Sequence, residues 1–158
     1  MIAAADEAAM QIALAEARSA GDDGEVPIGA VVLGADGRVV SRERNRREGR
    51  QDPTAHAEIL ALRQAGHVLG DWRLAGCTLV VTLEPCPMCA GAAVMSRVDR
   101  IVFGAWNEEY GAAGSRWDLP RDRRLNHRAE VVGGVRAEEC GAMVRQFMLS
   151  QRPGPEVR

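Results

Sequence analysis

Several features are missing from this sequence of 158 residues. It has no run of about 18 apolar residues, the length that a membrane-spanning helix requires. Near the N-terminus it carries the acidic pair Asp6 and Glu7, where a secretory signal would have basic residues before a longer apolar run. Its four cysteines are too few and too unevenly spaced for a disulfide scaffold. We therefore expect a cytoplasmic protein without a membrane partner, whose thiols are reduced or bind a metal.

An excess of positive charge is also missing. The chain has 20 basic and 22 acidic residues, a net charge of −2, and lysine is absent, so every basic residue is arginine. By the simplest charge argument such a chain does not bind nucleic acid. However, residues 38–50 carry a local charge of +4 and residues 116–128 a local charge of +3. These two basic segments are candidates for a surface that contacts phosphates, although solvated surface loops have the same composition.

Length and composition predict one globular domain. Hydrophobic residues make up 46% and charged residues 27% of the chain, as in an ordinary soluble protein. A typical domain has about 100–200 residues. We expect the domain to span residues 1–152 and a loose tail to follow at 153–158.

Hydrophobic periodicity and turn residues predict helices and strands in alternation. Asp36 and Gly37 suit a tight turn, so the runs beside them are expected to form an antiparallel hairpin. The order from residue 54 onward is typical of a three-layer α/β/α domain, with a mixed, mostly parallel five-stranded sheet and helices on both faces. The expected helices are 3–20, 54–66, 85–95 and 137–150, and the expected strands are 28–33, 38–42, 77–83, 100–104 and 129–132.

Two short motifs carry the residue types of a metal site. His56-Ala57-Glu58 and Pro85-Cys86-Pro87-Met88-Cys89 each stand at the start of a predicted helix. Two cysteines three positions apart on a helix place both sulfurs on one face, where the helix dipole favours their thiolates. A histidine and a glutamate two positions apart can serve one site only if it lies at the mouth of the helix. The pattern predicts a zinc ion held between two helix starts.

The number of ligands favours a catalytic zinc. His56, Cys86 and Cys89 leave a fourth position for water, as in catalytic sites. Two thiolates weaken the ion as a Lewis acid, so a carboxylate that accepts the proton of the water would assist, and Glu58 is the expected group. The alternatives are a redox role for the two cysteines and a structural zinc with a fourth protein ligand. The candidates for that ligand are Cys77, Cys140, His67 and His127, of which the two cysteines are expected core residues.

The two motifs resemble the signature of the zinc-dependent cytidine and deoxycytidylate deaminase superfamily. Further segments resemble the bacterial tRNA-specific adenosine deaminases, and together they cover nearly the whole chain. The last two segments below are similar to the tRNA enzymes in particular. These segments are Glu25–Val31, Asn45, Asp52–Ile59, Val81–Cys86, Phe103–Ala105, Gly111–Ser115 and Asn126–Arg128.

This resemblance implies a cytidine-deaminase-like fold and hydrolytic deamination of the wobble adenosine of a tRNA anticodon, typically of an arginine tRNA, to inosine. A hydroxide bound to one zinc ion per subunit would attack C6 of adenine, ammonia would leave, and Glu58 would shuttle the protons. In the family's fold the two basic segments, 38–50 and 116–128, flank the pocket. A homodimer that binds the anticodon stem-loop is also implied, and the small residues of the helix at 88–95 suit a two-fold contact. The rival hypotheses are a zinc deaminase of a free base or nucleoside, such as guanine or cytosine, and a non-catalytic zinc- or RNA-binding subunit.

The resemblance also implies which groups contact the substrate. Asn45 matches a residue that hydrogen-bonds the flipped base, and the backbone amides of Ala57 and Cys86 are donors near the site. At Asn107 the family usually carries an aspartate suited to a ribose hydroxyl. A neutral amide repels phosphate less, so we expect a weaker preference for RNA over DNA than in relatives. The full set of expected substrate contacts is Asn45, Val26, Pro27, Ile28, Ala57 and Asn107.

Overall fold

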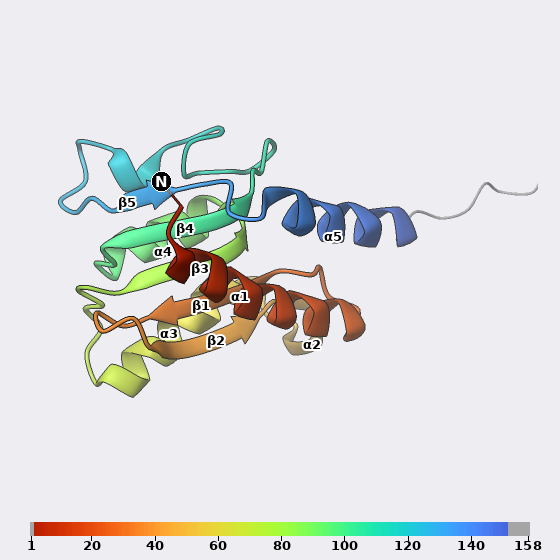
Figure 1. Ribbon diagram of the computed structural model, residues 1–158, viewed down its shortest axis with the longest axis horizontal. Helices are drawn as coiled ribbons and strands as arrows, with labels where there is room; N and C mark the ends of the chain where they lie inside the picture. The colour runs from red at the N-terminus through yellow and green to blue at the C-terminus, as the bar shows by residue number, and fades with distance from the viewer. Residues whose placement is uncertain (1, 152–158) are drawn as a thin grey trace, which may run out of the picture.

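A five-stranded sheet forms the centre of the structure, a computed structural model that describes residues 2–151 (Figure 1). The strand order is β2-β1-β3-β4-β5. The strands are β1 (Gly29–Leu33), β2 (Val39–Arg44), β3 (Thr78–Leu83), β4 (Arg100–Ala105) and β5 (Glu130–Val132). The helices are α1 (Ala4–Asp22), α2 (Arg47–Arg50), α3 (Ala57–Leu69), α4 (Pro87–Met95) and α5 (Ala137–Ser150), with a 3-10 turn, η1 (Leu119–Arg121).

The expected mixed sheet is confirmed, but it is less parallel than predicted. β3 pairs with β4 and β4 with β5 in parallel, whereas β1 is antiparallel to both β2 and β3. The crossover through α3 brings the chain back so that β3 runs in the same direction as β2. Because β1 lies between them, it opposes both neighbours. A second antiparallel pairing, with Ala30 opposite Val81, therefore joins the hairpin to the parallel strands.

Helices cover both faces of the sheet, as predicted. α1 and α5 pack on one face, and α3 and α4 pack on the other (Figure 1). Consecutive residues of β1 serve opposite cores, because side chains alternate along a strand: Val31 packs with α1 and Val32 with α3. α1 lies directly on the first residue of β1, where a Cβ on Gly29 would lie only 1.9 Å from the carbonyl oxygen of Ala13.

The helix containing the first motif starts and ends later than expected. Asp52 holds a turn by accepting the Thr54 N–H at 2.8 Å, so α3 begins only at Ala57. Gly66, the predicted stop, lies inside α3, which ends at Gly70 instead. Gly70 has a left-handed conformation (φ 68°), which terminates a helix, whereas a glycine inside a helix only weakens it.

Two expectations remain, one on the C-terminal boundary of the domain and one on membrane-spanning helices. The predicted boundary between residues 152 and 153, and the tail after it, lie outside the described residues. None of the helices in the described part is both long enough and apolar enough to cross a membrane.

Candidate active site

The two metal-binding motifs lie at the starts of neighbouring helices. His56 directly precedes α3, and Cys86 directly precedes α4, whose first turn contains Cys89. Pro87 takes the first position of α4, where its missing N–H costs no hydrogen bond. Both helices therefore direct their positive dipole ends and free backbone N–H groups toward one region, which favours negative charge there.

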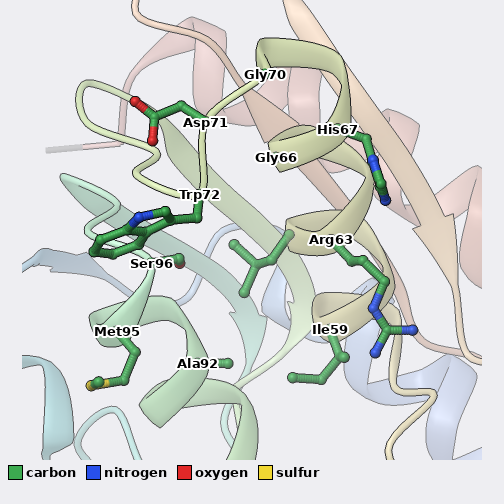
Figure 2. Close-up of a pocket in the computed structure, with 11 residues that line it drawn as sticks. Ile59, Arg63, Gly66, His67, Gly70, Asp71, Trp72, Ala92, Met95 and Ser96 are labelled. Atoms are coloured by element: carbon green, nitrogen blue, oxygen red, sulfur yellow. The ribbon is translucent and has the colours of Figure 1, made fainter.

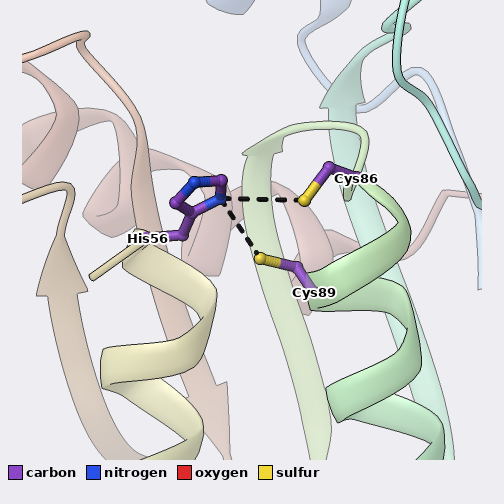
Figure 3. A group of neighbouring side chains, drawn as sticks. All are labelled: His56, Cys86 and Cys89. Carbon is purple, nitrogen blue, oxygen red and sulfur yellow. Dashed lines mark hydrogen bonds between the residues drawn. The ribbon is translucent and has the colours of Figure 1, made fainter. Parts of the chain in front are cut away.

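The three candidate ligands converge on one point (Figure 3). Nδ1 of His56 lies 3.7 Å from Sγ of Cys86 and 3.5 Å from Sγ of Cys89. All three ligand atoms lie within 4.8 Å of one another. Tetrahedral zinc with ordinary bond lengths separates its nitrogen and sulfur ligands by about 3.6 Å. The observed separations therefore fit a shared zinc ion.

The charges of this ligand cluster, defined by His56, Cys86 and Cys89, also fit zinc. Hydrogen bonds with Cys89 and His56 lower the pKa of the Cys86 thiol to about 4, which makes it a thiolate at neutral pH. Thiolate and imidazole are preferred donors of zinc. These residues are therefore placed to hold a zinc ion, as the sequence predicted.

Glu58 lies beside the ligand cluster in the first turn of α3. Its side chain is only 4% exposed, and this burial raises the pKa of its carboxyl. Within residues 2–151 the group of atoms close enough to share a metal contains the three ligands and excludes this carboxylate. Glu58 is therefore placed to exchange protons beside the metal.

The other candidate metal ligands lie elsewhere. Cys77 and Cys140 are buried in the core, and burial raises the pKa of Cys140 to about 11. His67 is eleven residues after His56 on α3, or about 16 Å along the helix. His127 Nε2 is hydrogen-bonded to the carbonyl of Val98 at 2.7 Å. None of them joins the ligand cluster in the described part of the chain, so the fourth position is available to a ligand from outside the protein.

A cavity of about 1110 Å³ opens beside the ligand cluster. We call it the site cavity. It is slightly larger than most ligand pockets, whose volumes extend to about 1000 Å³. His56, Glu58 and Cys86 form part of its wall. Its walls also include five of the six expected substrate contacts, Val26, Ile28, Asn45, Ala57 and Asn107.

Pro27 is the exception and does not line the site cavity. It is buried on the α1 side of the chain, where its Cβ lies 3.5 Å from the place that a Cβ on Gly21 would take. Successive residues of an extended segment point in opposite directions. Val26 and Ile28 therefore reach the cavity, whereas Pro27 packs against α1.

Asn45 lines the site cavity and also stabilises its wall. Its Nδ2 donates to the carbonyl of Val26 at 3.3 Å, and its Oδ1 accepts the N–H of Arg47 at 3.2 Å. An amide side chain can make four hydrogen bonds, so two remain for a ligand. With 6% of its surface exposed, Asn45 is held in one orientation before a ligand binds.

The loop after β4 forms a further wall. Trp106, Asn107 and Tyr110 all line the site cavity, and of these Asn107 was an expected substrate contact. Oδ1 of Asn107 accepts the N–H groups of Glu109 and Tyr110 at 3.3 and 3.0 Å. The side-chain oxygen therefore stabilises the turn, which leaves the amide nitrogen for a ligand.

α5 supplies a further wall of the site cavity. The helix at 137–150 was predicted, but hydrophobic periodicity does not distinguish a face that covers a core from one that lines a cavity. Cys140 is the one fully buried residue of α5, and the helix extends beyond the sheet in Figure 1. The lining residues from α5 are Ala137, Glu138, Gly141, Val144, Arg145 and Met148.

The two basic segments differ in their relation to the site cavity. The first contributes Arg47, which forms no ion pair with any residue in the range 2–151. The second contributes no lining residue in the described structure, and two of its arginines, Arg121 and Arg124, pair locally with Asp118 and Asp122 at 2.7 Å. The charge of residues 116–128 is thus partly neutralised within the segment. Arg116 nevertheless donates to the carbonyl of Glu108, a lining residue of the site cavity, at 2.9 Å. That both segments flank the site stays a prediction.

The fold and the ligand cluster together define a zinc-dependent deaminase. Residues 3–105, which contain all three ligands and Glu58, match the cytidine and deoxycytidylate deaminase zinc-binding region. The chain belongs to this deaminase family.

Three known proteins place the chain within that family. The tRNA-specific adenosine deaminase of Bacillus subtilis is 50% identical over 147 residues, which are 93% of this chain and 91% of the relative. A structure from studies of A-to-I editing by tRNA:A34 deaminases at the wobble position of transfer RNA is 43% identical, with a TM-score of 0.83 over 86% of this chain and 98% of its own. The guanine deaminase of Nitrosomonas europaea is 29% identical, with a TM-score of 0.74 over 93% of this chain and 85% of its own.

Proposed function

We propose that the protein hydrolyses the wobble adenosine of a tRNA anticodon to inosine and releases ammonia, with an arginine tRNA as its substrate. The observation that supports this most directly is that two of the metal ligands, His56 and Cys86, and the buried Glu58 line one cavity large enough for a nucleotide. The relative with 50% identity over 93% of the chain is a tRNA-specific adenosine deaminase, which supports adenosine in tRNA as the substrate.

The residues of the site divide the reaction between them. His56, Cys86 and Cys89 would hold the zinc ion, which would supply the Lewis acid that makes water a nucleophile toward C6 of adenine. Glu58 accepts a proton from the water and delivers it to N1. It then carries a second proton, from the new hydroxyl at C6, to the amino group, which leaves as ammonia. Burial favours this role, because it raises the pKa of Glu58 toward the pH at which a group both takes and gives protons.

The remaining walls hold the base and its neighbours. Val26 and Ile28 provide apolar contacts, and the two unused hydrogen-bonding positions of Asn45 are available to the flipped base. The backbone N–H of Ala57, in the first turn of α3, adds a donor.

The rival activity is deamination of a free base, and the similar protein from Nitrosomonas europaea is a guanine deaminase. Arg47 from α2 and Arg145 from α5 line the same site cavity. Arginines suit the phosphates on either side of a flipped nucleotide, and a free base has no phosphate to contact. This observation favours a polynucleotide substrate.

The test is a comparison of substrates. The purified protein is incubated with an arginine-tRNA anticodon stem-loop, guanine and cytosine side by side, and products are identified by mass spectrometry. We expect inosine at the wobble position and no product from either free base. A stem-loop with guanosine at the wobble position is the control. Xanthine from guanine, without inosine in the RNA, would show that the protein is a free-base deaminase.

We also propose that Asn107 weakens the preference for RNA over DNA. Asn107→Asp keeps an oxygen that can accept the N–H groups of Glu109 and Tyr110, so the turn is preserved and only the ligand-facing group changes. Rates on matched RNA and DNA hairpins are expected to differ less for the natural protein than for Asn107→Asp. An equally strong RNA preference in both proteins would contradict this role.

We further propose a homodimer with a two-fold contact at the groove between α3 and α4. This groove, about 710 Å³ in volume, is bordered by Trp72 and Met95, which are 57% and 61% exposed (Figure 2). Large exposed apolar side chains around a groove favour burial by another protein surface. Sedimentation at micromolar concentration is expected to show a dimer that Met95→Glu dissociates, whereas Leu149→Glu, a matched change on α5, leaves it intact. A monomeric natural protein would exclude the proposal.

We propose that the protein lies in the cytoplasm. The four cysteines, all within residues 2–151, form no disulfide with one another, and thiolate ligands persist where the surroundings are reducing. Fractionation of cells followed by detection of the protein in the cytoplasmic fraction tests this location.

A further inference from the structure

Glu84 is a buried carboxylate that the reaction does not use. It directly follows β3 and stands two residues before Cys86, with 1% of its surface exposed. No ion pair within residues 2–151 includes it. A buried charge is costly unless hydrogen bonds compensate for it, so its partners indicate its purpose.

All partners of this carboxylate belong to the loop after β4. Oε1 accepts the backbone N–H of Asn107 at 3.3 Å and the hydroxyl of Ser115. Oε2 accepts the N–H groups of Ala113 and Ser115 at 3.3 and 3.1 Å. A Cβ on Gly111 would lie 2.1 Å from Oε2, so only glycine allows the loop to approach this closely. The loop is wrapped around one side chain.

Backbone hydrogen bonds continue the same connection. The N–H of Glu84 donates to the carbonyl of Ala105, and the N–H of Ala112 donates to the carbonyl of Pro85, both at 2.8 Å. Pro85 is followed at once by the metal ligand Cys86. These hydrogen bonds therefore join the turn that carries the metal ligand Cys86 to the loop after β4. That loop presents Trp106, Asn107 and Tyr110 to the site cavity.

We propose that Glu84 is a positioning residue that holds the substrate-facing loop, residues 106–115, at a set distance from the metal centre. The proposal deepens the proposed function and rests on it for the identity of the substrate. A carboxylate is required because every partner is a donor and a carboxylate only accepts. Glutamine would direct two N–H groups at donors, and aspartate is one methylene too short to reach them.

The experiment compares the natural protein, loaded with zinc, with Glu84→Gln. Hydrogen exchange of the amides in 106–115 is expected to accelerate roughly tenfold or more, as the loss of hydrogen bonds to a charged group predicts. Zinc content stays at one ion per chain, because α3 and α4 carry the ligands. KM for the anticodon stem-loop is expected to rise roughly tenfold, because the displaced loop binds the substrate more weakly. The value of kcat should change less, because Glu58 keeps its position.

Asp6→Asn is the matched control. Asp6 is another carboxylate with 1% exposure, but it pairs with Arg100 and lies outside the site cavity. This variant is expected to lower the melting temperature without changing loop exchange or KM. If Glu84→Gln fails to fold, Ser115→Ala is used instead, because it removes only the hydrogen bond from the Ser115 hydroxyl to Glu84. It must accelerate hydrogen exchange in residues 106–115, by a factor smaller than the roughly tenfold one expected for Glu84→Gln.

The outcomes separate this proposal from the proposed function. Exchange is measured without substrate, so absence of inosine in the natural protein refutes the function and leaves the positioning role to be judged by exchange. Unchanged exchange in 106–115, an unchanged KM, or loss of zinc from Glu84→Gln would overturn the positioning role.

Discussion

Replacing Glu58 by glutamine separates proton transfer from metal binding. The two side chains have nearly the same volume, so the substitution creates no cavity at a position that is 4% exposed. It removes only the ability to accept and deliver a proton. The amide cannot replace the carboxylate in either transfer, while His56, Cys86 and Cys89 are untouched.

The expected magnitude follows from the role of the group. A positioned general acid–base contributes about 10²- to 10⁴-fold to the rate, which corresponds to about 3–5.5 kcal/mol in the activation barrier. Unlike the reaction rate, the stability of the folded protein should increase. Burial raises the pKa of the folded carboxyl above its ordinary value of 4.5, so its ionisation opposes folding as the pH rises above 4.5. The stability of Glu58→Gln relative to that of the natural protein is therefore expected to increase as the pH rises above 4.5.

The assay measures inosine under single-turnover conditions, and zinc by elemental analysis of the same sample. We expect one zinc ion per chain and a loss of turnover within the range above. A rate less than tenfold below that of the natural protein would refute Glu58 as the proton shuttle. Loss of zinc would show that Glu58 is a ligand.

Three further predictions concern stability and are measured by thermal or denaturant unfolding. Gly29→Ala in β1 is expected to lower the free energy of unfolding by about 1–3 kcal/mol or more, because its Cβ would lie 1.9 Å from the carbonyl oxygen of Ala13 in α1. Gly21→Ala, near the end of α1, meets only ordinary contacts and should be neutral or stabilising. Equal effects of the two substitutions would contradict the close approach of α1 to β1. Arg100 lowers the pKa of Asp6 below 3.8, so the stabilisation by this pair is present above pH 3.8 and is lost as the pH falls through the folded pKa. Asp6→Asn is accordingly expected to lower the free energy of unfolding by about 1–3 kcal/mol at neutral pH. The difference in stability between this variant and the natural protein should narrow below pH 3.8. A difference that does not change with pH would show that the ion pair with Arg100 is not its cause. A chelator that removes the metal should lower the melting temperature, because an ion that binds only the folded state stabilises it; an unchanged transition would show that the metal does not contribute to stability.

Local features of the chain were predictable because they depend on neighbouring residues. The spacing of Cys86 and Cys89 places both sulfurs on one face of a helix wherever that helix lies in the fold. Alternation and turn residues located all five strands to within two residues at each end. Gly66 was misjudged because a helix tolerates glycine, and the residue that ends α3, Gly70, is recognised by its left-handed backbone conformation.

Contacts between distant segments were not predictable in the same way. The pairing of β1 with β3 joins residues about fifty positions apart, and its direction depends on which side of the hairpin the crossover returns. The side on which Pro27 packs depends on the position of α1, which covers one side of that segment. Of the two basic segments, only the first lines the site cavity in the described structure, and charge along the chain does not report which segment does so.

The sequence by itself determined the chemistry of this protein: a histidine and two cysteines at helix starts, with a glutamate two residues after the histidine. These identities and spacings are sufficient because the geometry of a helix start is the same in any fold. Only the tertiary structure decided what surrounds the metal. It brings α5 to the site cavity and wraps the loop after β4 around Glu84, because the order of strands in the sheet places segments more than twenty residues apart side by side.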